Sequence, residues 1–209
     1  MLFDLLSALL DSWSLWNDVA GGPEAGRTWR TALLERVRAE GAYRDYETLM
    51  TEAATSTGLP ASRGADLVRR WDELRPWPGA NAMLRGLRGK LKTAVVTNCS
   101  ESLGRRAAAL LEVSFDTVVT AERAGSYKPD KHPYVLALHE LQVPASRALF
   151  VAGSPNDLLG GARAGLPVVW HNPLRLPIPR GLTEAGAAPP LAEIGSLAAL
   201  SKLLPGEEA

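Results

Sequence analysis

Polar side chains that could carry out chemistry lie at the ends of short apolar runs in this sequence. At the start of the chain, Asp4 is a single carboxylate inside MLFDLLSALL, with no acidic neighbour before Asp11. A carboxylate at the tip of a strand can act as a nucleophile and form a covalent intermediate. Later apolar runs lead to a hydroxyl, an amide, an ammonium and a second carboxylate, carried by Thr97, Asn98, Lys128 and Asp157.

Each of these residues also has a purely structural explanation. Thr97 and Asn98 fit the start of a helix, where side-chain oxygens accept hydrogen bonds from free amide groups. Lys128 precedes a proline, and a lysine in that position is usually on the surface. In SPND at 154–157 the serine fits a helix N-cap, the proline the first helical position and the aspartate a capping box. The functional interpretation therefore depends on the order of these residues along the chain.

The elements that must position these residues alternate between strand and helix. Strands are predicted at 2–3, 93–96, 115–119, 148–152 and 167–170, and helices over 80–88, 102–111, 133–141 and 157–164. This alternation predicts an α/β fold, a Rossmann-like parallel sheet with helices on both faces. Such sheets bind ligands beyond the carboxyl ends of their strands, where the candidate residues lie.

The segment 12–78 has a different pattern, which predicts a small all-helical cap inserted after the first strand. Helices are expected over 27–40, 44–56 and 62–74, and no convincing strand occurs between them. The predicted core domain therefore comprises 1–11 and 79–209, and the cap 12–78. Within the core, the stretch 173–190 is rich in Pro, Gly and Ala and is expected to be loop, followed by a last helix at 196–204.

The composition favours a cytoplasmic protein that acts on a small molecule. The chain has 209 residues, and its 23 basic and 23 acidic side chains give a net charge of zero, so there is no electrostatic case for binding nucleic acid or a membrane surface. No apolar run is long enough to span a bilayer. The single cysteine, Cys99, fits a reducing compartment, and the three histidines have neither a Cys–His pattern nor metal-ligand spacing.

Five short motifs occur in a characteristic order. They are DLLSALLD at 4–11, WR at 29–30, VTN at 96–98, KPD at 128–130 with PY at 133–134, and VAGSPND at 151–157 with a glycine-containing stretch at 160–165. Together they resemble the haloacid dehalogenase superfamily, and most of all its 2-haloacid dehalogenase branch. The resemblance runs over nearly the whole chain and implies the same fold, with the leading aspartate of the first motif as the nucleophile.

Most members of this superfamily transfer phosphoryl groups, and that chemistry makes two demands. A second aspartate, two residues after the nucleophile, protonates the leaving group, and an acidic residue in the fourth motif helps to hold magnesium. This chain has Leu6 and Gly153 at those positions. A halide leaves without a proton, so the resemblance implies metal-independent hydrolysis of short 2-haloalkanoic acids. Magnesium is expected only under the alternative, a phosphatase of small metabolites.

In the dehalogenase interpretation, Asp4 attacks the carbon that bears the halogen, and the configuration at that carbon inverts. Lys128 keeps Asp4 ionised, because a nearby cation lowers the pKa of a carboxyl group. Thr97 and the backbone amides after Asp4 are expected to bind the substrate carboxylate. Arg30 from the cap, together with Asn98, is expected to hold the departing halide.

The resemblance also implies how the ester is hydrolysed and what surrounds the substrate. Water is expected to attack the ester, oriented by Asp157 and Ser154. Arg30 has a rival explanation, since further arginines at 27, 36 and 38 would suit a solvated helix face. The remaining substrate contacts are expected to be largely apolar, and they comprise Leu5, Leu6, Leu34, Tyr46 and Tyr134.

Three positions depart from the dehalogenase pattern. Ala8 stands where a threonine hydroxyl supports the nucleophile, Ala152 replaces a serine that helps to orient the lysine, and Ser154 replaces an asparagine that assists hydrolysis. Such losses loosen the preorganisation of a site. A catalytically degenerate relative that binds a small carboxylate or a protein partner therefore remains a third hypothesis. Dimers are common in this branch, so a homodimer is a state that the resemblance allows.

Overall fold

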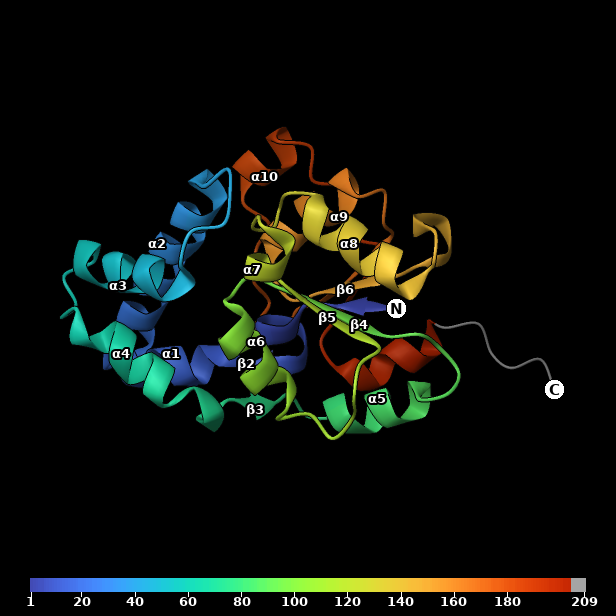
Figure 1. Cartoon of the computed structure of the whole chain (residues 1–209), viewed down its shortest axis with the longest axis horizontal. Coiled ribbons are helices and arrows are strands. Elements are labelled where there is room, and N and C mark those ends of the chain that lie inside the picture. The colour runs from blue at the N-terminus through green and yellow to red at the C-terminus, as the bar shows by residue number, and fades with distance from the viewer. Residues whose placement is uncertain (204–209) are drawn as a thin grey trace.

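A six-stranded parallel sheet forms the centre of the protein (Figure 1). The computed structural model describes residues 1–203, and within them the strand order is β5-β4-β1-β6-β7-β8. These strands are β1 (Leu2–Phe3), β4 (Ala94–Thr97), β5 (Thr117–Thr120), β6 (Phe150–Ala152), β7 (Val168–His171) and β8 (Ala192–Ile194). The predicted α/β fold with a parallel sheet is confirmed.

The position of β1 in this order determines where a ligand can bind. Leu2 pairs with Ala94 of β4 on one side and with Phe150 of β6 on the other. The chain builds β4 and β5 on the first side before it crosses to β6, β7 and β8 on the second. The carboxyl end of β1 is therefore a topological switch point, where the connecting loops part and leave a crevice. Asp4 is the residue at that end.

Helices cover both faces of the sheet, because successive side chains of each strand point to opposite faces. Leu2 and Phe150 pack on one face with Tyr134 of α8, whereas Phe3 and Val151 pack on the other. Figure 1 shows α8 and α9 on one side of the sheet and α5 on the other. The core helices are α5 (Ala80–Leu87), α6 (Glu101–Ala108), α7 (Ala121–Ala124), α8 (His132–Leu141) and α9 (Pro155–Arg163).

A helical cap follows the first strand, as predicted, and lies beside the core in Figure 1. Its own core contains the fully buried Trp29, whose indole N–H donates to the Met50 carbonyl at 2.8 Å and whose ring lies 4.5 Å from that of Trp16. The cap elements are α1 (Ser12–Ala20), α2 (Pro23–Ala39), α3 (Tyr46–Ser56), α4 (Ser62–Arg69) and a 3-10 turn (Trp71–Glu73).

The prediction that 12–78 contains no strand is wrong. β2 (Leu10–Asp11) and β3 (Arg75–Pro76) form a two-stranded antiparallel ribbon, with Leu10 opposite Pro76. Two residues are too few to show an alternating pattern, and the partner strands lie far apart in the sequence. The ribbon joins the two connections between cap and core, although the exact domain boundaries stay a prediction.

The C-terminal part also differs from the prediction. The stretch 173–190 is not all loop, since it contains α10 (Arg180–Glu184). The edge strand β8 follows it and was not predicted, because its sequence has no apolar run. The predicted last helix is a 3-10 turn, Leu197–Lys202, and Leu204 of that prediction lies outside the described residues. Within residues 1–203, no helix combines the length and the apolar character needed to cross a membrane.

The buried tryptophan of the cap gives a test of this packing. We expect Trp29→Ala to lower the free energy of unfolding by about 3–5 kcal/mol, because it leaves a large cavity and removes the indole hydrogen bond to the Met50 carbonyl. Urea denaturation measures this loss. Leu191→Ala is the control, since Leu191 is 71% exposed and its truncation should change stability by less than about 0.5 kcal/mol. Equal effects of the two substitutions would contradict the assigned cap core.

Candidate active site

Asp4 is held at the end of β1 by the turn that follows it. This turn, Leu5–Leu9, is π-helical, and Asp4 is its N-cap. Oδ2 of Asp4 accepts three hydrogen bonds, from the Ser7 amide at 2.8 Å, the Ala8 amide at 3.0 Å and the Ser7 hydroxyl at 2.8 Å. The carboxylate is nearly inaccessible to solvent. Its orientation is therefore fixed before any ligand arrives.

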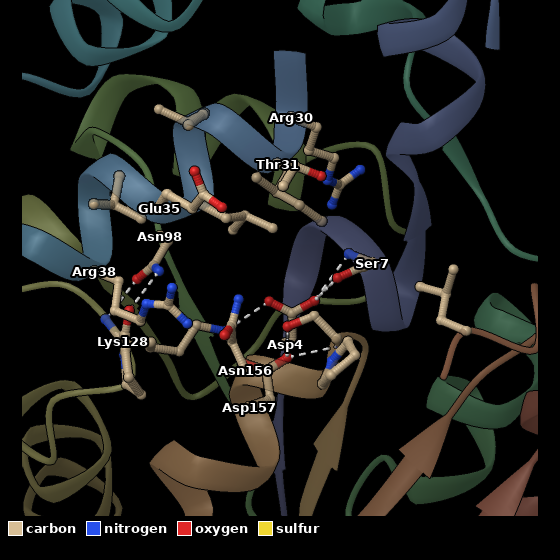
Figure 2. Close-up of a pocket in the computed structure, with 18 of the residues that line it drawn as sticks. Asp4, Ser7, Arg30, Thr31, Glu35, Arg38, Asn98, Lys128, Asn156 and Asp157 are labelled. Atoms are coloured by element: carbon tan, nitrogen blue, oxygen red, sulfur yellow. Dashed lines mark hydrogen bonds and ion pairs between the residues drawn. The ribbon is translucent and has the colours of Figure 1, made fainter. Parts of the chain in front are cut away.

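Lys128 lies between Asp4 and a second buried carboxylate, Asp157. Its Nζ is 2.7 Å from Oδ1 of Asp4 and 2.8 Å from Oδ1 of Asp157 (Figure 2). All three side chains are buried, so bulk water screens these ion pairs very little. The structure therefore brings into direct contact a lysine and two carboxylates that follow different strands in the sequence.

Asp157 is both a capping residue and a member of this cluster. Its Oδ2 accepts from the Gly153 amide at 3.1 Å, the Ser154 amide at 3.0 Å and the Ser154 hydroxyl at 3.1 Å, which forms the capping box predicted at the start of α9. Both carboxylates thus have the same environment: two amides and a serine hydroxyl on Oδ2, and the ammonium on Oδ1. The structural and the functional explanations of Asp157 are compatible.

The cluster separates the proton affinities of its members. Burial alone would raise the pKa of Asp4, but the Lys128 ammonium and the hydrogen bonds from Lys128 and Ser7 bring that pKa below its ordinary value. Burial raises the pKa of Asp157, and the charge of Asp4 raises it further against the opposing effect of Lys128. Burial would lower the pKa of Lys128, yet the charges of Asp157 and Asp4 raise it. Asp4 is thus the more acidic of the two carboxyl groups, and Asp157 is the more basic one.

Asn98 positions the lysine through its backbone. Its Nδ2 donates to the Lys128 carbonyl at 3.0 Å, and its Oδ1 accepts from the Lys128 amide at 2.7 Å. Its amide group is therefore already engaged, whereas the resemblance placed it beside the halide. Thr97 is fully buried and lies 3.7 Å from the Cys99 sulfur. Burial raises the pKa of Cys99 to about 12, which makes this thiol a poor nucleophile.

Arg30 enters the site from α2 of the cap. Its Nη1 donates to the Ser12 hydroxyl at 2.6 Å, and its guanidinium carbon lies 4.0 Å from the centre of the Trp13 ring. The Ser12 hydroxyl in turn donates to the Leu6 carbonyl in the turn after Asp4. Arg30 is 8% exposed, so the solvated-face explanation does not apply to it.

These residues surround a cavity of about 380 Å³ between cap and core. Its wall includes most of the predicted site residues, namely Asp4, Leu6, Arg30, Leu34, Tyr46, Thr97, Asn98, Lys128, Ser154 and Asp157. Leu5 and Tyr134 are not part of the wall. The Leu5 side chain packs fully into the core, and the Tyr134 ring packs edge-on against Phe150 beneath the site. Sequence spacing placed both near the site but could not give the direction of their side chains.

Three residues of the site were missed from the sequence. Ser7 supports Asp4 with a hydroxyl, one position before the alanine that the resemblance marked as a loss. Its spacing of three from an N-cap aspartate was a usable signal. Ser12 and Trp13 hold Arg30, and no local pattern pointed to them, because their partner lies on the next helix.

The donor set does not fit a magnesium ion. Magnesium binds near-octahedral oxygen shells, usually through one or two carboxylates and several waters. Here the space between the two carboxylates contains the Lys128 ammonium, and within residues 1–203 no three His, Cys, Asp or Glu side chains form a candidate metal site. A Cβ at Gly153 would overlap the Ser7 carbonyl carbon and the Ala8 amide nitrogen, so an acidic side chain has no room there.

The sequence model of the haloacid dehalogenase-like hydrolase family matches residues 15–165 of this chain. This chain belongs to that family. Its solved neighbours include an L-2-haloacid dehalogenase from Xanthobacter autotrophicus, with a TM-score of 0.82 and 26% identity over 97% of this chain and 96% of that one.

Relatives by sequence carry two kinds of name. An (S)-2-haloacid dehalogenase of Pseudomonas putida is 28% identical over 82% of this chain and 84% of its own length. A putative pyrophosphatase, PpaX, of Clostridium perfringens is 37% identical, but the match covers only 45% of either chain. The protein is therefore a hydrolase of this family, and the choice between a carbon–halogen bond and a phosphate ester as the bond that is cleaved depends on the site.

Removing the central cation tests the electrostatics of the cluster. We expect Lys128→Met to destabilise the protein by about 3–5 kcal/mol at pH 7, since it leaves two carboxylates buried and unpaired. Without the cation, burial raises both carboxyl pKa values above those of the unfolded chain. The loss should then shrink as the pH falls toward 5, because protonation removes the buried charge.

Urea denaturation at the two pH values measures this effect. Lys131→Met is the matched control, since Lys131 is an exposed lysine close by in sequence and should show little loss at either pH. A loss for Lys128→Met that is the same at both pH values would contradict the proposed charge cluster.

Proposed function

We propose that this protein hydrolyses the carbon–halogen bond of 2-haloalkanoic acids and releases 2-hydroxy acids. The observation that carries the proposal is the buried Asp4–Lys128–Asp157 cluster, which supplies a charged nucleophile without a metal-ligand set. Leu6 lines the cavity where a phosphatase would need a proton donor. A halide departs without a proton, whereas an alkoxide leaving group needs one, so the site favours the halide.

The hydrogen bonds of Asp4 support Oδ1 as the attacking oxygen. Oδ2 already accepts three hydrogen bonds, while Oδ1 accepts only from Lys128 and keeps a lone pair for attack. Oδ1 forms a bond to the carbon that bears the halogen as the carbon–halogen bond breaks. The halide leaves with the bonding electrons, and no proton moves. In-line attack inverts the configuration of that carbon.

The groups that bind the substrate carboxylate and the departing halide come from different domains. The guanidinium of Arg30, fixed against Trp13 and Ser12, supplies the positive charge for the departing halide. The Thr97 hydroxyl and the first-turn amides of Leu5 and Leu6 supply donors for the substrate carboxylate, since the first amides of a helical turn have no partner within it. Leu5 would then contribute its backbone and not its side chain.

The same contacts prepare the second half of the reaction. Once Oδ1 is alkylated, Oδ2 becomes the ester carbonyl oxygen, and its three donors form an oxyanion hole. Water adds to the carboxyl carbon of Asp4 and gives a proton to Asp157, whose pKa is raised by burial. Collapse breaks the bond between that carbon and Oδ1, and the proton passes from Asp157 to the departing alkoxide. The second proton of the water, left on the Asp4 carboxyl group, goes to solvent and restores the carboxylate. The product hydroxyl oxygen therefore comes from Asp4, and the water oxygen stays on the enzyme.

A halide assay with and without chelator tests the proposal. We expect halide release from 2-chloro- and 2-bromopropionate, unchanged by chelator and lost in Asp4→Asn. A single turnover in heavy-oxygen water should place the label on Asp4, which peptide mass spectrometry detects. Label found only in the first product would exclude the ester route. Phosphate release from an aryl phosphate, abolished by chelator, would favour the phosphatase, and thermal stabilisation by unreacted acids would favour a binding protein without turnover.

Ser7→Ala separates the two chemical steps. The oxyanion hole loses one donor while both amides remain, so we expect ester hydrolysis to slow by about 100-fold and halide release in the first turnover to change less. Intact mass measurement of quenched enzyme should then reveal accumulated ester. Ser102→Ala, at an exposed serine of α6, is the control and should behave as the parent protein. A slow first turnover without accumulated ester would show that Ser7 serves the displacement and not the hydrolysis.

A further inference from the structure

The cavity is larger than a short 2-haloacid requires. Its volume is about 380 Å³, within the range of roughly 300–1,000 Å³ that is typical of pockets for larger ligands. A 2-halopropionate has six non-hydrogen atoms. Even at roughly 30 Å³ each, the share of a water molecule in the liquid, these atoms fill about 180 Å³. About half of the cavity is left beyond the reacting end.

The wall that the short acid leaves uncovered is mainly apolar and comes from two elements. The cap contributes Leu34 and Val37 of α2, and the core contributes Leu176, Pro177 and Leu182 from the stretch that leads into α10. Residues of both α2 and α10 line the cavity, and Figure 1 shows α10 near one end of α2. Apolar surface on both sides favours a hydrocarbon chain between them.

The Leu176 side of this wall is held in place without a ligand. Nδ2 of Asn172 donates to the Leu176 carbonyl at 2.9 Å, and Oδ1 of Asn172 accepts from the Leu176 amide at 2.8 Å. Asn172 itself is buried. A single side chain therefore fixes both backbone groups of Leu176, and the apolar wall is preformed.

The charges at the rim do not favour a second anionic group on the substrate. Glu35 and Arg38, one turn apart on α2, both line the cavity and are both exposed (Figure 2). They carry opposite charges, so this part of the rim has no net charge. The other cations of the wall serve the reacting end of the substrate, because Arg30 is assigned to the departing halide and Lys128 is paired with the two carboxylates.

We propose that the preferred substrates are 2-haloalkanoic acids of about nine carbons in all, whose apolar chain extends from the reacting carbon between α2 and the 174–182 stretch. The inference rests on the proposed dehalogenase function and names its substrate class. At the same roughly 30 Å³ per atom, the remaining 200 Å³ holds about six further carbons. Burial of each methylene strengthens binding of substrate and transition state alike.

A chain-length series tests this. We measure kcat/KM for 2-bromopropionate, 2-bromobutanoate, 2-bromohexanoate and 2-bromooctanoate by halide release. The expected result is a rise of about fourfold for each added methylene until the cavity is filled. A flat or falling series overturns the inference and leaves the dehalogenase proposal intact. A preference for 2-bromoadipate over 2-bromohexanoate also overturns it, since that acid carries a second carboxylate. No halide from any acid overturns the proposed function and the inference with it.

A matched pair of variants tests where the alkyl chain of the substrate lies in the cavity. Leu176→Trp fills the cavity and should lower kcat/KM for 2-bromooctanoate at least tenfold more than for 2-bromopropionate. Leu174→Trp introduces the same side chain two residues earlier, at a position that is 45% exposed and does not line the cavity, and should leave the ratio unchanged. Equal ratios in the two variants overturn the assigned path. The series on the unaltered protein decides the chain-length question even where Leu176→Trp fails to fold.

Discussion

The buried ammonium of Lys128, shared between two carboxylates, is the interaction on which the rest of the site depends. Taking three charges out of water is costly unless each is paired and hydrogen-bonded. The structure meets this requirement with two matching sets of donors, because each carboxylate directs one oxygen at Lys128 and the other at two amides and a serine hydroxyl. The π-helical turn after Asp4 and the first turn of α9 direct those amides at the two carboxylates.

The sheet topology explains why these groups meet. β1 lies between β4 and β6, and chain segments diverge from its carboxyl end in both directions. Asp4, at the end of β1, therefore faces residues supplied by the loops that follow its neighbours. The cap, entered and left through the β2–β3 ribbon, adds Arg30 from the opposite side. A chain of contacts from Arg30 through Ser12 to the Leu6 carbonyl ties the cap directly to the turn that holds Asp4.

The choice of leaving group depends on what the residues around Asp4 cannot do. Leu6 offers no proton, Lys128 takes the position between the carboxylates, and close packing of Gly153 against the Ser7–Ala8 peptide leaves no room for another ligand. In a family whose members carry both kinds of name, these local constraints discriminate more sharply than overall similarity. The hydroxyl of Ser7 also compensates for Ala8, so that departure does not leave Asp4 without a hydroxyl donor.

The sequence by itself determined the alternation of strands and helices, the helical cap and the order of Asp4, Lys128 and Asp157, because these follow from local periodicity and from residues at strand ends. It did not determine the β2–β3 ribbon or β8, which are too short to carry a pattern. Only the tertiary structure decided that Arg30 is buried on Trp13, that Leu5 and Tyr134 point away from the cavity, and that Ser7 supports Asp4. The physical reason is that a side chain's direction and burial depend on contacts between segments distant in sequence, and no local pattern records those contacts.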